Sequence, residues 1–444
     1  MKKTNSIVKE NYHLWHPWTG MSKYQPLVIE EGKGSWLKDT GGKWYIDGAS
    51  SLWVNVHGHR HAFIDREICG QIRKISHSTL FGLSNIPAIE LAEKLVAISP
   101  AGLNRVFYSN SGSEACEVAL KIAFRYWQQC KRPKKRKTKF IHPNLSYHGD
   151  TLGATSVGGI GLFRNLYKPL LFESISAPTP YCYRCPFDKN EKTCAKECLS
   201  EVERIIKKNH NEVAALIMEP LIQGAAGMIT QPSGYLREVR RLTRKHDILL
   251  ILDEVAVGFG RTGNMFACEQ EGVSPDIMTT SKGLSGGYLP LAATLTTEKI
   301  YRAFLGDHRA FLHGHTYTGN PLACRAALAS LSVFQKQKTL EKLKAKISLL
   351  TRLLLPFNSL EHVGEVRQCG FMVGLELVRD KQTKEAYRWQ ENIDVKVTLK
   401  AREKDIIIRP LGNVIVIMPP LSIKSWELKK LIQGIYESIK EVTA

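Results

Sequence analysis

The sequence lacks any stretch of about 18 or more apolar residues in its 444 positions, so we expect no transmembrane helix. Residues 1–5 are polar and lead into an aromatic segment, where a secretory signal peptide would have an apolar core. Composition is otherwise ordinary for a globular protein, with 43% hydrophobic and 23% charged residues. We therefore expect a cytoplasmic protein that has no membrane partner.

Acidic residues are scarce relative to basic ones, with 42 Asp and Glu against 62 Lys and Arg, which gives a net charge of +20. Part of the excess lies in one basic run at residues 131–137. The run contains no aromatic residue that could stack on a base. A solvated loop between a helix and a strand is the favoured interpretation, and we expect no nucleic-acid partner.

Ten cysteines are spread along the chain, and six of them are isolated, which favours small, reduced, buried side chains: Cys69, Cys116, Cys130, Cys268, Cys324 and Cys369. The other four form a cluster, Cys182-x-x-Cys185 followed by Cys194-x-x-x-Cys198. Their spacing is compatible with tetrahedral Zn²⁺. Reduced cysteines on a surface excursion are the favoured alternative, and no metal site is predicted.

Three regions differ in their patterns. Residues 1–60 contain short apolar pieces separated by turns, which predict a small antiparallel sheet. Residues 61–335 alternate apolar runs with amphipathic helices, which predicts an α/β domain with a mostly parallel sheet. Residues 336–444 read as α+β, and we expect them to form a smaller domain together with the N-terminal segment.

Asp253 ends the apolar strand predicted at residues 248–252. In a parallel α/β sheet, the carboxyl ends of the strands are where ligands bind. A carboxylate at such a place can keep the nitrogen of a pyridine cofactor protonated, and it can equally serve as a helix N-cap.

Lys282 follows the next apolar strand and is surrounded by small residues and glycines. A lysine that forms a Schiff base with pyridoxal 5'-phosphate needs space for a flat ring and a lowered pKa. An isolated lysine is more often a surface residue. The strand before it and its spacing from Asp253 favour the catalytic interpretation.

A phosphate site is predicted where the strand at residues 105–108 meets the following helix. Gly112 would let the backbone approach a phosphate closely, and Ser113 adds a hydroxyl at the N-terminus of the helix. A capping turn without a ligand is the alternative. Tyr147 offers an aromatic face for a cofactor ring, although a packed tyrosine would be commoner.

Three segments together resemble class III (ornithine/GABA-type) pyridoxal-phosphate aminotransferases: residues 253–263, 281–283 and 313–321. The resemblance covers nearly the whole chain. It implies the fold type I architecture of pyridoxal-phosphate enzymes and a homodimer with shared active sites.

The resemblance also implies roles for individual residues. Lys282 would be the Schiff-base lysine and the general acid/base, and Asp253 would pair with the ring nitrogen. Tyr147 would stack on the ring and border the substrate. Gly112 and Ser113 would contact the phosphate, together with His315 and Thr316 from the second subunit. Trp53 and Gly314 would line the substrate channel, with Arg261 near it. Arg409 would bind the substrate carboxylate.

Further segments, including residues 14–17, 50–59 and 409–412, resemble a branch of this family that works in biotin biosynthesis. That branch transaminates 8-amino-7-oxononanoate to 7,8-diaminononanoate. Many of its members have Tyr where this chain has Trp18, and a Trp pair where it has Leu52-Trp53. Because these positions touch the amino donor, S-adenosylmethionine and lysine both stay open as donors, and another class III ω-amino acid aminotransferase is the alternative function.

Overall fold

The computed structural model describes residues 13–21, 26–190 and 192–444. The polar segment at residues 1–5 lies outside the described residues. Within the described residues, no helix combines the length and the apolar character that crossing a membrane requires.

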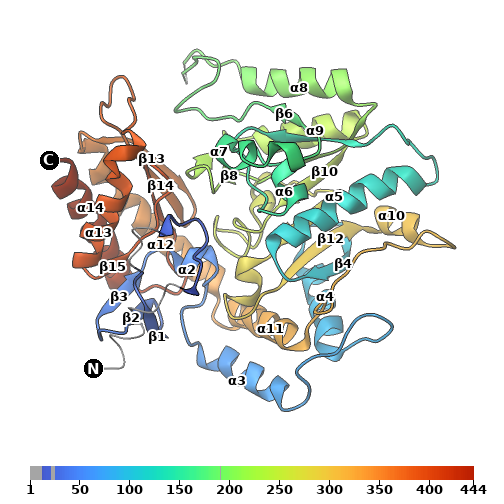
Figure 1. The fold of residues 1–444 in the computed structure, drawn as a ribbon, viewed down its shortest axis with the longest axis horizontal. Coiled ribbons are helices and arrows are strands. Elements are labelled where there is room, and N and C mark those ends of the chain that lie inside the picture. Colours follow the sequence, from blue (N-terminus) through green and yellow to red (C-terminus); the bar gives the residue numbers. More distant parts are fainter. Residues whose placement is uncertain (1–12, 22–25, 191) are drawn as a thin grey trace.

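A seven-stranded sheet forms the centre of the larger part of the molecule (Figure 1). Its order is β4-β12-β11-β10-β7-β5-β6, and β12 is antiparallel to both neighbours while the other pairings are parallel. The strands are β4 (Leu103–Ser109), β5 (Lys139–Pro143), β6 (Ile175–Ala177), β7 (Val213–Met218), β10 (Leu249–Asp253), β11 (Ile277–Thr280) and β12 (Ala292–Thr297). The predicted mostly parallel sheet is confirmed.

The central strands are buried over their whole length because both faces of the sheet are covered. Every residue of β7, β10 and β11 is buried. Helix α5 packs on β11 and β12, and α9 packs on β10. The helices of this part are α3 (Ala62–Ile72), α4 (Ile86–Ile98), α5 (Gly112–Gln129), α6 (Leu152–Ser156), α7 (Gly161–Asn165), α8 (Glu197–Asn209), α9 (Tyr235–Lys245), α10 (Glu298–Tyr301) and α11 (Pro321–Lys336).

Two smaller sheets lie beside the large one, on the side where the chain reaches its C-terminus (Figure 1). One joins distant segments, because β15 (Ile406–Ile407) pairs in parallel with β3 (Trp44–Asp47), at the edge of the antiparallel strands β1 (Ile29–Lys33), β2 (Trp36–Asp39) and β3. The other contains β13 (Val363–Cys369), β14 (Met372–Leu377) and β16 (Val414–Ile417). Helices α12 (Thr339–Leu354), α13 (Ile393–Glu403) and α14 (Ser425–Thr443) accompany them, and β8 (Ile222–Gln223) and β9 (Ile229–Thr230) form a separate hairpin.

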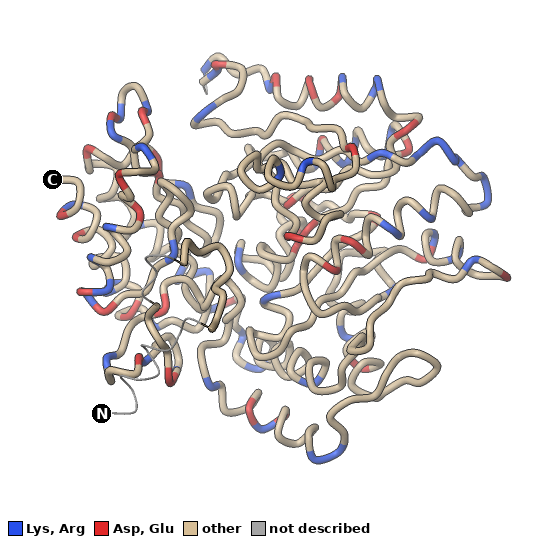
Figure 2. Tube along the Cα trace, viewed as in Figure 1, with Lys and Arg blue, Asp and Glu red and all other residues tan. Residues whose placement is uncertain are grey.

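The basic run connects α5 to β5 as a loop, which Figure 2 shows as a blue stretch at the edge of the molecule. Lys137 departs from the expected solvated loop because its side chain is buried. Its ammonium donates to the carbonyl oxygens of His210, Val213 and Asp247 at 2.7, 2.9 and 2.8 Å and lies 4.7 Å from the Trp127 ring. This lysine closes the loop onto the protein.

No disulfide joins any of the ten cysteines, all of which lie in the described ranges. Cys116, Cys268 and Cys324 are buried as expected, whereas Cys130 and Cys369 are half-buried. The expectation is wrong for Cys69, which is exposed. That residue lies on α3, where only Ile64 and Gln71 are buried, so most of the helix faces outward.

Candidate active site

A cavity of about 850 Å³ lies at the carboxyl ends of the central strands. Seven of the predicted site residues line it: Trp53, Gly112, Ser113, Tyr147, Asp253, Lys282 and Arg409. Ligands of open α/β sheets bind at this edge. The cavity therefore has the position that the strand pattern predicted.

Asp253 is held at the end of β10 by four hydrogen bonds. One oxygen, Oδ2, contacts His148 Nδ1 at 2.7 Å and accepts from the Cys116 thiol at 3.5 Å. The other, Oδ1, accepts from the Val255 amide at 3.0 Å and the Thr279 hydroxyl at 3.2 Å. A buried carboxylate bonded on both oxygens has one orientation and offers a fixed negative charge to the cavity.

Lys282 follows β11 and opens a 3-10 turn, η5 (Lys282–Ser285). Its φ of 42° lies in the left-handed region, which is a strained backbone of the kind found at functional sites. The ammonium lies 4.7 Å from the Trp53 ring. Burial lowers its pKa from 10.5 to about 8, and the negative charges of Asp253 and Glu219 oppose that shift.

The N-terminus of α5 forms a cradle beside these groups. Ser111 caps the helix by accepting from the Glu114 amide at 3.2 Å. A Cβ added to Gly112 would come within 2.6 Å of the Val255 side chain, so only glycine fits there. Ser113 Oγ donates to Thr151 Oγ1 at 3.0 Å and accepts from the Thr151 amide at 3.1 Å. Such a helix start binds anions through its backbone amides.

Aromatic side chains form one wall. Burial raises the pKa of Tyr147 above its usual range, so its hydroxyl keeps its proton. Its ring lies edge-on to Phe163 with centroids 5.9 Å apart, and the Trp18 ring centroid lies 4.3 Å from that of Phe163. Trp18 and Leu52 are exposed at the entrance of the cavity.

Residues 50–53 (α2, Ser50–Trp53) form a left-handed turn that carries Leu52 and Trp53. All four residues have positive φ, from 49° at Ser50 to 93° at Leu52. Left-handed backbone costs roughly 1–2 kcal/mol for each residue other than glycine. Ser50 Oγ anchors the turn by donating to the Met418 carbonyl at 2.7 Å.

Arg261 also holds this turn. It was expected near the substrate channel but does not line the cavity, and it is only 1% exposed. Its guanidinium donates to the carbonyl oxygens of Trp53 at 3.3 Å, Asn55 at 3.2 Å and Pro419 at 2.6 Å. Arg261 thus supports the backbone behind Trp53.

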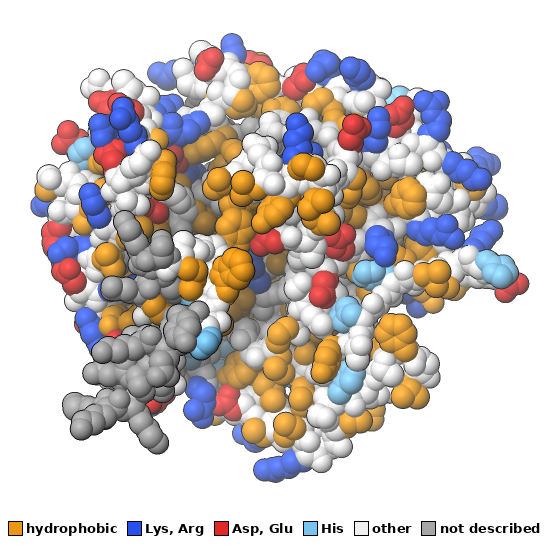
Figure 3. Space-filling model, in the orientation of Figure 1, with side chains coloured by type: hydrophobic (Ala, Val, Ile, Leu, Met, Phe, Trp, Pro, Cys, Tyr) orange, Lys and Arg blue, Asp and Glu red, His pale blue; other side chains and the backbone are white. Residues whose placement is uncertain are grey.

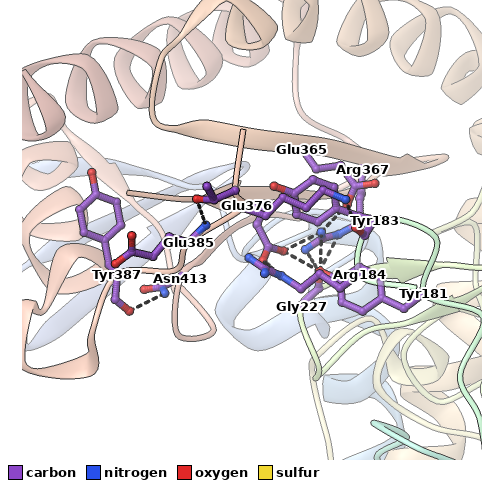
Figure 4. Close-up of polar contacts among 12 residues, drawn as sticks. Tyr181, Tyr183, Arg184, Gly227, Glu365, Arg367, Glu376, Glu385, Tyr387 and Asn413 are labelled. Carbon is purple, nitrogen blue, oxygen red and sulfur yellow. Dashed lines mark hydrogen bonds and ion pairs between the residues drawn. The ribbon is translucent and has the colours of Figure 1, made fainter. Parts of the chain in front are cut away.

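A second buried arginine supports another part of the lining, formed by Ala225 and Ala226. Arg367 donates to the Gly227 carbonyl at 2.6 Å and pairs with Glu376 at 2.7 Å (Figure 4). The turn after β8 is therefore tied to the β13–β14 hairpin.

Arg409 lies in the segment between β15 and β16 and is exposed at the entrance. Arg409 and Tyr147 line the same cavity. An exposed arginine at the mouth of a cavity can take a carboxylate in a bidentate contact.

Gly314, His315 and Thr316 do not line this cavity within one chain. His315 Nδ1 lies 3.2 Å from Asn110 Nδ2, and its Nε2 lies 3.3 Å from Glu114. Gly314 lies against the Phe81 ring. The roles predicted for these residues across a subunit boundary stay predictions.

Two lining residues escaped the sequence reasoning, Glu219 and His148. Burial raises the pKa of Glu219 to about 7, and its oxygens accept from the amides of Tyr147 at 3.2 Å and Gly224 at 2.9 Å. Glu219 directly follows the buried strand β7, and Asp253 is the last residue of the buried strand β10. This position at the end of a strand could have identified Glu219 as a site residue from the sequence. His148 adjoins Tyr147, but only the fold brings it to Asp253.

Comparisons with known proteins find similar proteins over nearly the whole chain. The sequence pattern of the family described as "Aminotransferase class-III" matches residues 19–439. The chain is 53% identical over 437 residues to the adenosylmethionine-8-amino-7-oxononanoate aminotransferase of Nitratidesulfovibrio vulgaris. The aligned residues make up 97% of this chain and 81% of that protein.

Two solved structures are similar over nearly their whole length. The crystal structure of adenosylmethionine-8-amino-7-oxononanoate aminotransferase from Methanocaldococcus jannaschii is 47% identical, with a TM-score of 0.94 and coverage of 98% of this chain and 99% of that one. A PLP-bound amine transaminase from an uncultivated Pseudomonas species is 33% identical, with a TM-score of 0.91 and coverage of 96% and 98%.

Proposed function

The chain belongs to the class III aminotransferases, and we propose that it transfers the amino group of S-adenosylmethionine to 8-amino-7-oxononanoate in biotin biosynthesis. The product is 7,8-diaminononanoate. The observation that carries the proposal is the 53% identity, over 97% of the chain, to a relative named for this reaction. The exposed Arg409 at the mouth of the cavity supports it, because the acceptor has a carboxylate.

The enzyme is pyridoxal-phosphate-dependent, as its family is, and the cavity fits that cofactor. The cradle at Gly112 and Ser113 suits a phosphate, and Asp253 suits a protonated ring nitrogen. His148 Nε2 is buried without a hydrogen-bond partner among the described residues, so part of the polar lining awaits a ligand. When bound, pyridoxal 5'-phosphate supplies a carbonyl that takes up an amine and a ring that withdraws electrons.

The chain's own residues then divide the work. Lys282 Nζ takes the proton from the α-carbon of the donor and later returns a proton to the former carbonyl carbon of the acceptor. Its lowered pKa makes the neutral amine available near neutral pH. Asp253 holds a proton on the ring nitrogen, and Tyr147 and Trp53 enclose the reacting atoms and exclude water.

Arg409 orients the acceptor by its carboxylate. Its place at the entrance leaves the ketone end directed toward Lys282 at the bottom of the cavity. Bidentate contact gives orientation as well as binding energy.

Product formation from 8-amino-7-oxononanoate tests the function. Parallel reactions contain S-adenosylmethionine, lysine or a simple primary amine as donor. We expect 7,8-diaminononanoate with S-adenosylmethionine. Product with lysine alone would replace the donor, whereas conversion of amines without any use of this acceptor would favour another class III ω-aminotransferase.

We further propose a homodimer with shared active sites, in which His315 and Thr316 of one chain complete the phosphate site of the other. A groove of about 660 Å³ near α5 supports this, since it is lined by Phe124, Phe140, Phe172, Phe311 and Leu312. Hydrophobic side chains also gather over the middle and lower part of the face shown in Figure 3, and exposed apolar patches of this kind mark protein interfaces.

Mixing two inactive variants tests shared sites. Lys282→Ala and His315→Ala homodimers are unfolded together, refolded and assayed. If sites are shared, mixed dimers contain one complete site and activity returns. Activity no higher than that of either parent would contradict the sharing.

The proposed organisation is a large unit at residues 61–335 and a small unit made from residues 1–60 and 336–444. The parallel pairing of β3 with β15 supports it. The absence of disulfides among the ten cysteines is consistent with the proposed cytoplasmic location.

A further inference from the structure

Cys116 is a fully buried thiol in the second turn of α5, the helix whose N-terminus forms the cradle at Gly112 and Ser113. Its side chain does not line the cavity but lies behind it, where α5 packs on β10 and β11. The four clustered cysteines at positions 182–198 are, by contrast, exposed or half-buried. Cys116 is therefore the thiol that lies beside the cavity floor.

The Cys116 thiol contacts the carboxylate that is proposed to pair with the cofactor ring. Its Sγ donates to Asp253 Oδ2 at 3.5 Å and lies 3.8 Å from Thr279 Oγ1. Thr279 in turn donates to the other oxygen, Asp253 Oδ1, at 3.2 Å. One side chain from the helix and one from the neighbouring strand thus fix both oxygens of Asp253.

The thiol acts as the donor in this contact. Burial, together with the negative charge of Asp253, raises the pKa of the Cys116 thiol well above its ordinary value, so the sulfur keeps its proton. An ionised carboxylate can only accept hydrogen bonds. The bond therefore adds a donor to Asp253 and stabilises its negative charge.

A second donor converges on the same oxygen. His148 Nδ1 lies 2.7 Å from Asp253 Oδ2, and the polar atoms of Cys116, His148 and Asp253 all lie within 4.8 Å of one another. The outer nitrogen of this imidazole, Nε2, is buried without a hydrogen-bond partner among the described residues, and His148 lines the cavity. The cluster is thus closed by hydrogen bonds on the protein side and open toward a ligand.

The donors on Asp253 affect where a shared proton lies. Asp253 and the ring nitrogen of the cofactor compete for one proton when they face each other. Hydrogen bonds that stabilise the carboxylate leave the proton on the nitrogen, where it makes the ring withdraw electrons more strongly. Without the thiol, the proton would lie closer to Asp253 and the ring would be less cationic.

We propose that Cys116 is a positioning residue of the reaction, whose thiol acts through Asp253 to keep the ring nitrogen protonated. Cys116 touches neither the cofactor nor the substrates. The inference rests on the proposed function, and in particular on the role proposed for Asp253. The proton and the thiol stay in place throughout, so no oxidation and no change in bonding at sulfur are involved.

Two variants of nearly equal size separate the donor from the packing. Cys116→Ala and Cys116→Ser both remove the sulfur, but serine keeps a hydroxyl that can donate to Asp253. The pH titration of the visible absorption of the bound cofactor is measured for each enzyme. In Cys116→Ala the midpoint should rise by about one pH unit, because a less cationic ring lets the link to Lys282 keep its proton to a higher pH. Cys116→Ser should restore the wild-type midpoint.

Steady-state rates give a second measurement. In Cys116→Ala, kcat should fall by about tenfold, the order expected for one weak hydrogen bond to a charged group, while KM for both substrates should stay the same. Cys324→Ala is the matched control, because it truncates another fully buried thiol, on α11, outside this cluster. It should leave the absorption midpoint and kcat at their wild-type values.

Asp253→Asn is titrated in parallel to separate this inference from the proposed function. If Asp253→Asn shifts the midpoint but Cys116→Ala does not, the role of the thiol is overturned while that of Asp253 stands. If Asp253→Asn causes no shift, the role of Asp253 and the inference both fail. Equal shifts in Cys116→Ala and Cys116→Ser would also overturn the inference, because packing rather than the donor would then be responsible.

Discussion

Asp253, Glu219 and His148 at the floor of the cavity are buried and Lys282 beside them is half-buried, whereas Trp18, Leu52 and Arg409 at its mouth are exposed. At the floor, Asp253 makes four hydrogen bonds within the chain, so its position is set before any ligand arrives. The mouth consists of exposed side chains that can adjust. From this difference we propose that the residues at the floor carry out the chemistry, while the residues at the mouth select the donor and the acceptor. Substitutions should separate the two.

The largest effect is expected for Lys282→Ala. The variant removes the amine that we propose moves the proton, so kcat should fall by at least about 10⁴-fold, the upper range for general acid–base catalysis. Steady-state product formation measures it. Lys344→Ala, an exposed lysine on α12, is the control and should be unaffected. If Lys282→Ala kept even a tenth of the activity, the floor would not contain the catalytic lysine.

Asp253→Asn should come next. It keeps the shape of the side chain but removes the fixed charge, and we expect kcat to fall by about 10²–10³-fold, as when one preorganised electrostatic contact is lost. Cofactor content is measured in the same samples, so that weaker binding is not mistaken for slower chemistry. A change confined to cofactor affinity would contradict the proposed role.

Arg409→Lys tests the mouth. It keeps the positive charge and removes bidentate geometry, so it should lower kcat/KM for the acceptor by roughly 10–100-fold, corresponding to about 1.5–3 kcal/mol for hydrogen bonds to a charged group. The half-reaction with the donor, followed by single-turnover absorbance, should be unchanged. Equal losses in both half-reactions would mean that Arg409 contributes to the proton transfer itself rather than to acceptor binding.

The fourth prediction concerns pH. Burial lowers the pKa of Lys282 to about 8, so its neutral, nucleophilic form dominates above that pH and becomes rarer as pH falls below it. Stopped-flow recombination of the apoenzyme with pyridoxal 5'-phosphate should therefore accelerate up to a pH of about 8 and then level off. Continued acceleration toward 10.5, the ordinary lysine value, would mean that the amine is solvated.

Leu52→Trp should have the smallest effect. An added aromatic face at the mouth can stack on the adenine of S-adenosylmethionine, and aromatic pairs contribute about 0.5–1.5 kcal/mol, so KM for this donor should fall by roughly 2–10-fold with kcat unchanged. Trp18→Tyr on the same rim is the matched comparison. A lower kcat in Leu52→Trp would show that mouth and floor are coupled.

Much of this arrangement could be predicted from local patterns. Apolar strands that alternate with helices indicated the sheet, and the polar residues after those strands, Asp253 and Lys282, indicated its ligand-binding edge. Lys137 shows where prediction from local patterns ends. Its burial depends on three carbonyl groups supplied by distant segments. Nothing in the local sequence distinguishes it from its neighbours in the basic run.

The long-range contacts of Arg261 and Glu219 escaped prediction for the same reason. Arg261 contacts carbonyl groups about 158 to 208 positions away in the chain, and no local pattern records such a pairing. Positive φ at Leu52 was also hidden, since leucine rarely adopts that conformation and only its surroundings impose it.

The left-handed turn at residues 50–53 has a consequence for how this enzyme can change over evolutionary time. Its shape is imposed by hydrogen bonds to Arg261 and to the Met418 carbonyl, and the Leu52 side chain takes little part in folding because it faces solvent. Mutations at this position can therefore accumulate with little effect on stability while they alter what enters the cavity. The enzyme can therefore acquire a new amino donor through neutral substitutions at Leu52, without any change to the residues at the floor of the cavity.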